Sequence, residues 1–131
     1  MLHYVTLGSN DLNRAQVFYD AVLASIGMAR SVTSDGELGY GLAVPDGRTR
    51  ARFFYVVKPF LDYPATWGNG TLVAFTAPSH AAVDAFHAAA IANGGKDDGA
   101  PGLRPYHENF YSCYVRDPDG NKLSAVCESG A

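Results

Sequence analysis

Residues 4–27, YVTLGSNDLNRAQVFYDAVLASIG, align without a gap on residues 72–95, LVAFTAPSHAAVDAFHAAAIANGG. Val5 matches Val73, Phe18 matches Phe86 and Gly27 matches Gly95. Two unrelated amphipathic helices can share apolar spacing, but they do not also share a preceding strand and a closing glycine in the same register. The alignment therefore predicts an internal duplication.

Each copy begins with a short strand of alternating character, at residues 4–7 and 72–76. Successive side chains of a strand point to opposite faces of its sheet. One face is expected to carry Val5, Leu7, Val73 and Phe75 and to pack against helices. The other face is expected to carry Tyr4, Thr6, Leu72, Ala74 and Thr76.

A helix follows each of these strands. Leu12, Ala15 and Phe18 begin a helical apolar spacing in the first copy, and Val83, Phe86 and Ala90 do so in the second. Ser9 or Asn10 can cap the first helix, and Ser79 the second. Gly27 and Gly94-Gly95 are expected to end them, since glycine accepts the left-handed conformation beyond a helix.

Strands complete each copy. They are predicted at residues 39–44 and 52–57, and at 111–116 and 123–127, with one more near 29–33. The counterpart of that last strand, near 96–106, contains two glycines and two prolines and is expected to be a loop with only weak strand character. Pro45-Asp46-Gly47 and Pro118-Asp119-Gly120 are turn sequences that close the last hairpin of each copy.

These elements predict an α+β fold in a single domain, residues 1–131. Two strand-helix-three-strand modules, a first half of about 1–66 and a second half of about 67–131, would form one curled mixed sheet with the helices on its convex side. Two helices cannot cover both faces of eight strands. The concave face would remain open as a cleft for a ligand.

The composition suits one soluble globular domain: 131 residues, 47% hydrophobic, 18% charged, net charge −3. No basic patch points to nucleic acid, and no apolar run points to a membrane span or a signal peptide, so we expect a cytoplasmic protein. A hairpin turn at 117–120 would place Cys113 opposite roughly residue 124. Cys127 is then too far along the strand for a disulfide, and both cysteines are expected to be reduced.

The duplicated pattern resembles the glyoxalase, bleomycin resistance and dioxygenase superfamily, also called the vicinal oxygen chelate superfamily. The resemblance covers almost the whole chain and is closest to small bacterial members described as lactoylglutathione-lyase-like. It is carried by Val5-Thr6-Leu7-Gly8, Asp11-Leu12, Phe18-Tyr19, Val73-Ala74-Phe75, residues 83–87, Gly94-Gly95, residues 99–104 and residues 116–121.

The resemblance implies a fold of two such modules around a divalent metal held by His and Glu of the first and last strands of each module. Here the family's His positions fall on Tyr4 and Leu72, one Glu position falls on Ser124, and the fourth lies within residues 53–56, which offer no carboxylate or imidazole. His3 lies one residue from the first position, but strand alternation is expected to turn it to the opposite face. We therefore predict no metal site and no cofactor.

The open face would then bind its ligand with aromatic and hydroxyl groups. His107 is the best candidate for a catalytic residue, because its unperturbed pKa is close to neutral. His107, Glu108, Tyr111 and Cys113 lie close in sequence but have no recognised metal-ligand spacing. The predicted ligand-binding residues are Tyr4, Thr6, Phe54 or its neighbours, Trp67, Leu72, Arg104, His107, Tyr111 and Ser124.

Three functions remain open from the sequence. The first is metal-independent binding of a small aromatic or amphipathic molecule, in a protein that forms a homodimer. The second is a glyoxalase-like lyase or isomerase, or a dioxygenase relative, that acts on a small oxygenated substrate. The third is a regulatory or structural partner protein, which only the acidic surface supports.

Overall fold

The computed structural model describes residues 1–45 and 49–131. The predicted turn at Pro45-Asp46-Gly47 therefore lies largely outside the described residues. In chain order the elements are β1 (Val5–Gly8), α1 (Leu12–Ala24), β2 (Met28–Thr33), β3 (Glu37–Ala43), β4 (Thr49–Val57), β5 (Val73–Thr76), α2 (His80–Ala92), β6 (Lys96–Leu103), β7 (Tyr111–Arg116) and β8 (Lys122–Cys127).

The strands form two sheets of four, in the orders β1-β4-β3-β2 and β5-β8-β7-β6. β1 runs parallel to β4 and β5 runs parallel to β8, while the other pairs are antiparallel. The duplication is thus confirmed in the topology. The expected single curled sheet is resolved into two mixed sheets, with no hydrogen-bonded strand pair between them in the described part of the chain.

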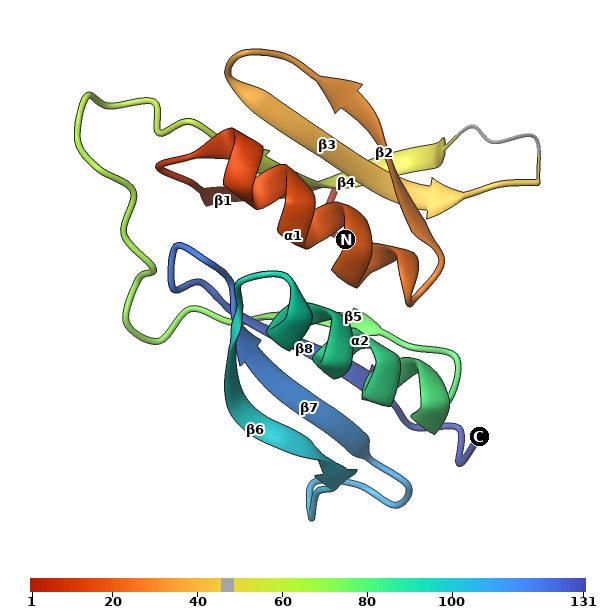
Figure 1. Ribbon diagram of the computed structural model, residues 1–131. Helices are drawn as coiled ribbons and strands as arrows, with labels where there is room; N and C mark the ends of the chain where they lie inside the picture. Colours follow the sequence, from red (N-terminus) through yellow and green to blue (C-terminus); the bar gives the residue numbers. More distant parts are fainter. Residues whose placement is uncertain (46–48) are drawn as a thin grey trace.

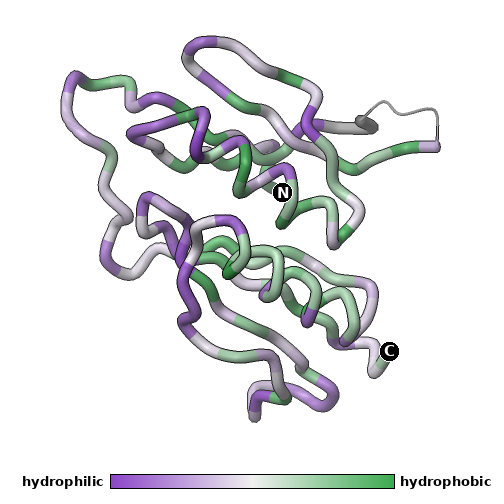
Figure 2. Tube along the Cα trace, viewed as in Figure 1, coloured by the Kyte–Doolittle hydropathy of each residue, from purple (hydrophilic) through white to green (hydrophobic). Residues whose placement is uncertain are grey.

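Both helices cover the same side of the two sheets and lie side by side (Figure 1). Figure 2 shows hydrophobic residues along the helices and purple, hydrophilic residues at many of the connections. Asp11, not Ser9 or Asn10, caps α1 by accepting a hydrogen bond from the Arg14 N–H. Ser79 caps α2 as expected. Neither helix has the length and apolar character required to cross a bilayer.

One aromatic core runs through both halves beneath the helices. Ring centroids are 5.3 Å apart between Tyr19 and Phe54, 5.1 Å between Phe54 and Phe75, and 6.2 Å between Phe75 and Phe86. Because Phe54 belongs to the first half and Phe75 to the second, the two halves share one buried core.

The expectation of a loop with only weak strand character near 96–106 is wrong for its first part, because residues 96–103 form the edge strand β6. The glycines and prolines instead make its register irregular, with shifts between Asp97 and Gly99 and between Gly99 and Gly102. An edge strand needs to pair on one side only, which is why it tolerates proline. Cys113 lies opposite Ala125 and Cys127 opposite Tyr111, and both cysteines are free and buried.

Candidate ligand-binding site

The first strands of the two halves present the side chains that alternation predicts. Leu7 and Phe75 are buried toward the helices, at 8% and 6% exposed. Tyr4 and Leu72, on the opposite side, are 55% and 44% exposed. The face without helices is therefore open along β1 and β5, and we call it the open face.

An apolar groove lies where the two sheets meet. Its volume is about 350 Å³, and its walls come from the start of β1, from β4 and from β5. It is lined by Leu2, His3, Tyr4, Val5, Phe53, Leu72, Val73, Ala74 and Phe75. We call this cavity the seam groove. It brings together two of the predicted residues, Tyr4 and Leu72.

The placement of Phe54 on the open face is wrong. Val5 pairs with Phe54 in the parallel register of β1 and β4, so Phe54 shares the helix-facing side with Val5 and is fully buried. Its neighbours Phe53 and Tyr55 take the open face, and Phe53 lines the seam groove. A run of four consecutive apolar residues has no alternation from which a face could be predicted.

His3 also differs from its expected orientation. Its ring lies edge-on to that of Tyr4, with centroids 5.7 Å apart, and not on the opposite face of the sheet. His3 and Tyr4 line a second hollow beside the groove, together with Thr6, Glu37 and Tyr55. Thr6 is thus a neighbour of the seam groove and lies outside its lining.

The open face of the second sheet carries a row of positive charge. Lys96, Arg116 and Lys122 are aligned in register across β6, β7 and β8. In the next row Ser124 lies opposite Tyr114, whose ring has the Arg104 guanidinium 5.6 Å and the Lys122 ammonium 5.2 Å from its centre. The Arg116 guanidinium lies 5.3 Å from the centre of the Trp67 ring.

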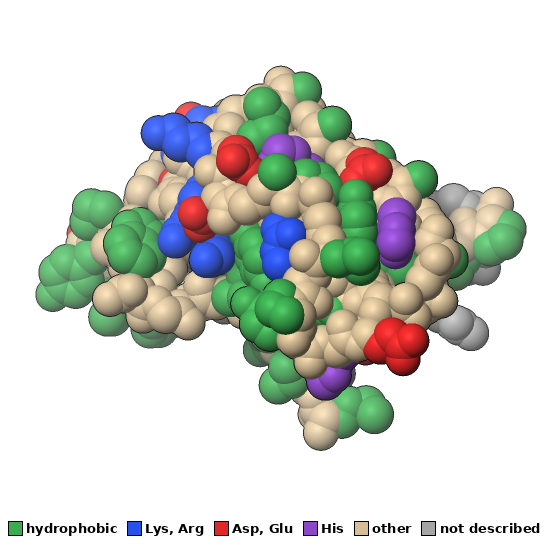
Figure 3. Space-filling view, turned by 90° about the horizontal axis from the view of Figure 1, so that it is seen from below, with side chains coloured by type: hydrophobic (Ala, Val, Ile, Leu, Met, Phe, Trp, Pro, Cys, Tyr) green, Lys and Arg blue, Asp and Glu red, His purple; other side chains and the backbone are tan. Residues whose placement is uncertain are grey.

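Ser124 occupies the predicted face but is closed to a ligand in this conformation, because it is only 1% exposed. Its hydroxyl, like that of Ser112, has no hydrogen-bond partner among the described residues. Viewed from the side of the second half, Lys and Arg side chains gather beside hydrophobic ones (Figure 3).

The structure does not bring His107 and Tyr111 to the seam groove. His107 is exposed in the connection between β6 and β7, at the edge of the sheet opposite β5, with its ring 6.1 Å from that of Phe110. Tyr111 faces α2: it stacks on His80 at 4.0 Å and donates to Asp84 at 2.6 Å. That hydrogen bond raises the pKa of Tyr111, which disfavours it as a base.

A metal ion at this site would have to be held by the donor groups of the side chains present. Within residues 1–45 and 49–131, no group of three or more His, Cys, Asp or Glu side chains could hold a metal ion. A phenol at Tyr4, an alkyl group at Leu72 and a buried hydroxyl at Ser124 do not make the imidazole and carboxylate set that a divalent transition metal requires. Tyr4, Leu72 and Ser124, the residues expected at the ligand positions, do not supply that donor set.

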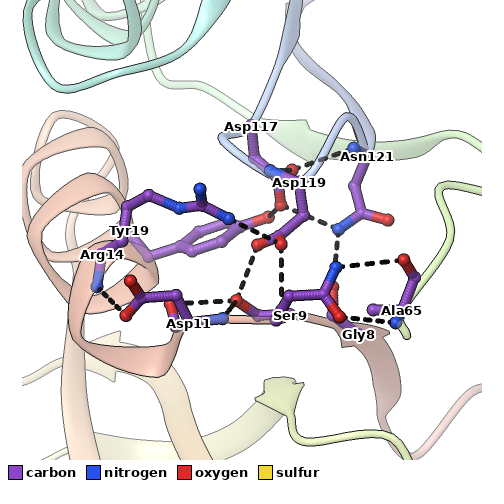
Figure 4. Close-up of polar contacts among 10 residues, drawn as sticks. Gly8, Ser9, Asp11, Arg14, Tyr19, Ala65, Asp117, Asp119 and Asn121 are labelled. Atoms are coloured by element: carbon purple, nitrogen blue, oxygen red, sulfur yellow. Dashed lines mark hydrogen bonds and ion pairs between the residues drawn. The ribbon is translucent and has the colours of Figure 1, made fainter. Parts of the chain in front are cut away.

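A network of polar contacts links the two halves of the chain, and we call it the clasp (Figure 4). It is formed by Gly8, Ser9, Asn10, Arg14, Tyr19, Asp117, Asp119 and Asn121. For residues 117–120 the sequence predicts only a turn. The β7–β8 turn reaches across to the junction of β1 and α1. Asp119 accepts hydrogen bonds from the Ser9 hydroxyl at 2.6 Å, the Asn10 N–H at 2.9 Å and Arg14 at 2.8 Å. Asn121 donates to the Gly8 carbonyl at 3.0 Å.

At the centre of the clasp Asp117 accepts a hydrogen bond from the Tyr19 hydroxyl at 2.5 Å. Burial raises the pKa of both groups. The hydrogen bonds of the clasp thus join the two halves of the chain, which together line the seam groove.

Comparison with known proteins identifies the class that this fold defines. The family model of the glyoxalase/bleomycin resistance protein/dioxygenase superfamily matches residues 1–124. The chain belongs to this superfamily, as its duplicated strand-helix-three-strand topology also indicates.

Solved structures agree with this assignment. A glyoxalase/bleomycin resistance protein from Albidiferax ferrireducens T118 is 40% identical, with a TM-score of 0.83 over 97% of this chain and 98% of that one. A lactoylglutathione lyase from Agrobacterium tumefaciens shares the fold at 20% identity, TM-score 0.64, over 97% and 92% of the two chains. A fosfomycin resistance protein from Listeria monocytogenes, complexed with Mn(II) and sulfate, does so at 18% identity, TM-score 0.65, over 98% and 90%. No curated protein matches the sequence.

Proposed function

We propose that this protein binds a small aromatic or amphipathic molecule in the seam groove without a metal. The observation that carries the proposal is the groove itself, a cavity of about 350 Å³ with an almost entirely apolar lining. Apolar cavities of this size with a few polar groups nearby are typical of small-molecule sites. Tyr4 and Phe53 offer ring faces and edges on which a flat ligand can stack.

The positions at which the superfamily holds its metal support the same proposal. The family resemblance implies a His at the position of Leu72, which lines the groove and has no lone pair to donate. The same position that would bind a metal in a relative thus adds apolar surface here. The two free, buried cysteines are in keeping with a reducing compartment, and we propose that the protein acts in the cytoplasm.

The experiment is binding of naphthalene-2-carboxamide, a flat uncharged probe, measured by calorimetry and by the fluorescence of Trp67, the single tryptophan. Leu72→Gln places a polar amide in the groove and should raise Kd about tenfold or more, from the lost burial of apolar surface. Leu103→Gln is the matched control, because Leu103 is an exposed leucine of the opposite edge strand, β6. Equal affinities in the two variants, or no saturable binding to the native protein, would overturn the proposal.

The alternative is a metal-dependent lyase, isomerase or dioxygenase relative acting on a small oxygenated substrate, which membership of the superfamily favours. It requires stoichiometric nickel, zinc, manganese or iron(II) that survives dialysis, together with turnover of such a substrate. That result would replace the binding function with the enzymatic one.

We also propose that two copies associate. The connection between the halves exposes several large apolar side chains, Phe60, Leu61 and Tyr63, and Leu2 of the seam groove is also exposed. Surface of this kind is typical of an interface. A second copy is the partner that we propose for it.

A further inference from the structure

A further hollow of different chemistry shares one lining residue, Leu72, with the seam groove. This hollow, of about 340 Å³, is lined by Trp67, Asn69, Gly70, Thr71, Leu72, Arg116 and Lys122. Leu72 lines both cavities, so a ligand that rests on Leu72 in the groove has one end next to the hollow. We call the hollow the cationic end of the site.

The charges at this end do not balance. Arg116 and Lys122 share one carboxylate, that of Asp98, at 2.8 Å and 3.6 Å from its Oδ2 atom. Lys96 continues their row on β6, and the neighbouring Asp97 is paired with His87 of α2. Two cations against one acid leave an excess positive charge in a chain whose net charge is −3.

Arg116 and Lys122 both have N–H groups that could donate hydrogen bonds to an anion. Arg116 uses Nε on Asp98 and Nη1 on the Gly120 carbonyl, and its guanidinium carbon lies 5.3 Å from the centre of the Trp67 ring. In the described part of the chain no hydrogen bond involves its Nη2 atom. The Lys122 ammonium is too far from Asp98, at 3.6 Å, for a good hydrogen bond. A cation–π contact helps to hold a guanidinium in place without using its N–H groups.

We propose that the ligand is a hydrophobic anion, with its apolar body in the seam groove and a carboxylate or similar group held by Arg116 and Lys122. This inference rests on the proposed function, because the groove must first accept the apolar body. It adds the chemical class of the ligand and the residues that select it. Asp98 positions the two cations, and Trp67 forms a wall of the hollow that reports on binding.

The test compares two probes of the same shape, naphthalene-2-carboxylate and the uncharged naphthalene-2-carboxamide, on the native protein. We expect the carboxylate probe to bind about fivefold more tightly than the amide probe. Raising the salt concentration should weaken binding of the carboxylate and leave binding of the amide unchanged. Quenching of Trp67 fluorescence should be larger with the carboxylate.

Lys122→Gln should remove most of this preference and change the affinity for the amide less than about twofold. Lys58→Gln is the matched control, because Lys58 lines a different cavity beside α1. Arg116→Gln should act in the same direction as Lys122→Gln.

The outcomes separate the two proposals. If the amide binds and the carboxylate binds no more tightly, or if Lys122→Gln weakens both probes alike, the anionic ligand is overturned and the groove stands. If neither probe binds, the proposed function fails and the inference fails with it.

Discussion

The buried Asp117 shows how a single residue can have two effects of opposite sign. Its carboxylate orders the clasp by accepting from Tyr19 and from Asn121 at 2.9 Å, yet its burial opposes ionisation. The net result is a pKa raised above the ordinary value of about 3.9. The folded chain therefore holds the Asp117 proton more tightly than the unfolded chain does.

Because protonation and folding are linked, this raised pKa makes the free energy of unfolding depend on pH. A raised folded-state pKa stabilises the fold below the unfolded pKa, and that contribution is lost as the pH rises through the folded pKa. Asp117→Asn has no proton to lose at this position. We expect the free energy of unfolding of the native protein, relative to Asp117→Asn, to fall as the pH rises from about 3 toward 7. Urea unfolding of both proteins at a series of pH values measures this difference in the free energy of unfolding. A native protein that gains stability over Asp117→Asn as the pH rises would show that the fold stabilises the ionised carboxylate.

At the scale of elements, the faces of β1 and β5 could be predicted and the face of β4 could not. β1 and β5 alternate in side-chain character and align with each other, so two independent signals agree on Leu7 and Phe75. In β4 the apolar run around Phe54 has no alternation, and only its pairing with β1 decides which side chains line the groove. For β6 the sequence predicts only weak strand character, because its glycines and prolines oppose strand formation locally, while its pairing with β7 supplies the hydrogen bonds.

Gly95 is the position where α2, β6 and the other half of the chain come closest. A β-carbon there would lie 2.7 Å from the Phe18 ring and 2.8 Å from the carbonyl oxygens of Ala90 and Arg116. Because two of these neighbours are backbone atoms, they cannot move aside as a flexible side chain would.

We therefore expect Gly95→Ala to destabilise the protein by roughly 1–3 kcal/mol. Gly36→Ala is the control, since nothing lies within 4 Å of a β-carbon at Gly36. It should leave the midpoint of thermal unfolding nearly unchanged. A Gly95→Ala protein as stable as the control would mean that the junction of α2 and β6 is looser than these distances indicate.

For the whole molecule, the fold class and the duplication follow from sequence alone, whereas the clasp and the cationic end depend on contacts between distant segments. Asp119 and Ser9 belong to motifs that each read locally as a turn or a cap. Nothing in either motif identifies the other as its partner, and the same holds for Arg116 and Trp67.

The proposed association of two copies is a prediction at this scale. The protein has a chain mass of 14.0 kDa, and sedimentation or light scattering at micromolar concentration should give about twice that value. The variant with Phe60→Ser and Leu61→Ser should shift to the monomer, because both side chains are exposed on the connection between the halves. Val17→Ser, at an apolar position on α1 about as exposed as Leu61, should remain dimeric. A native protein that sediments as a monomer would overturn the proposal.

The clasp has a consequence for the order in which the protein matures on the ribosome. Tyr19 and Asp117 are separated by 98 residues, and Ser9 and Asp119 by 110. The first half is translated well before its polar partners exist, so the Tyr19 hydroxyl stays without its acceptor until the last hairpin has left the exit tunnel. The nascent first half can form its strands and helix early, but it reaches its final packing only after the β7–β8 turn has emerged and bound to it.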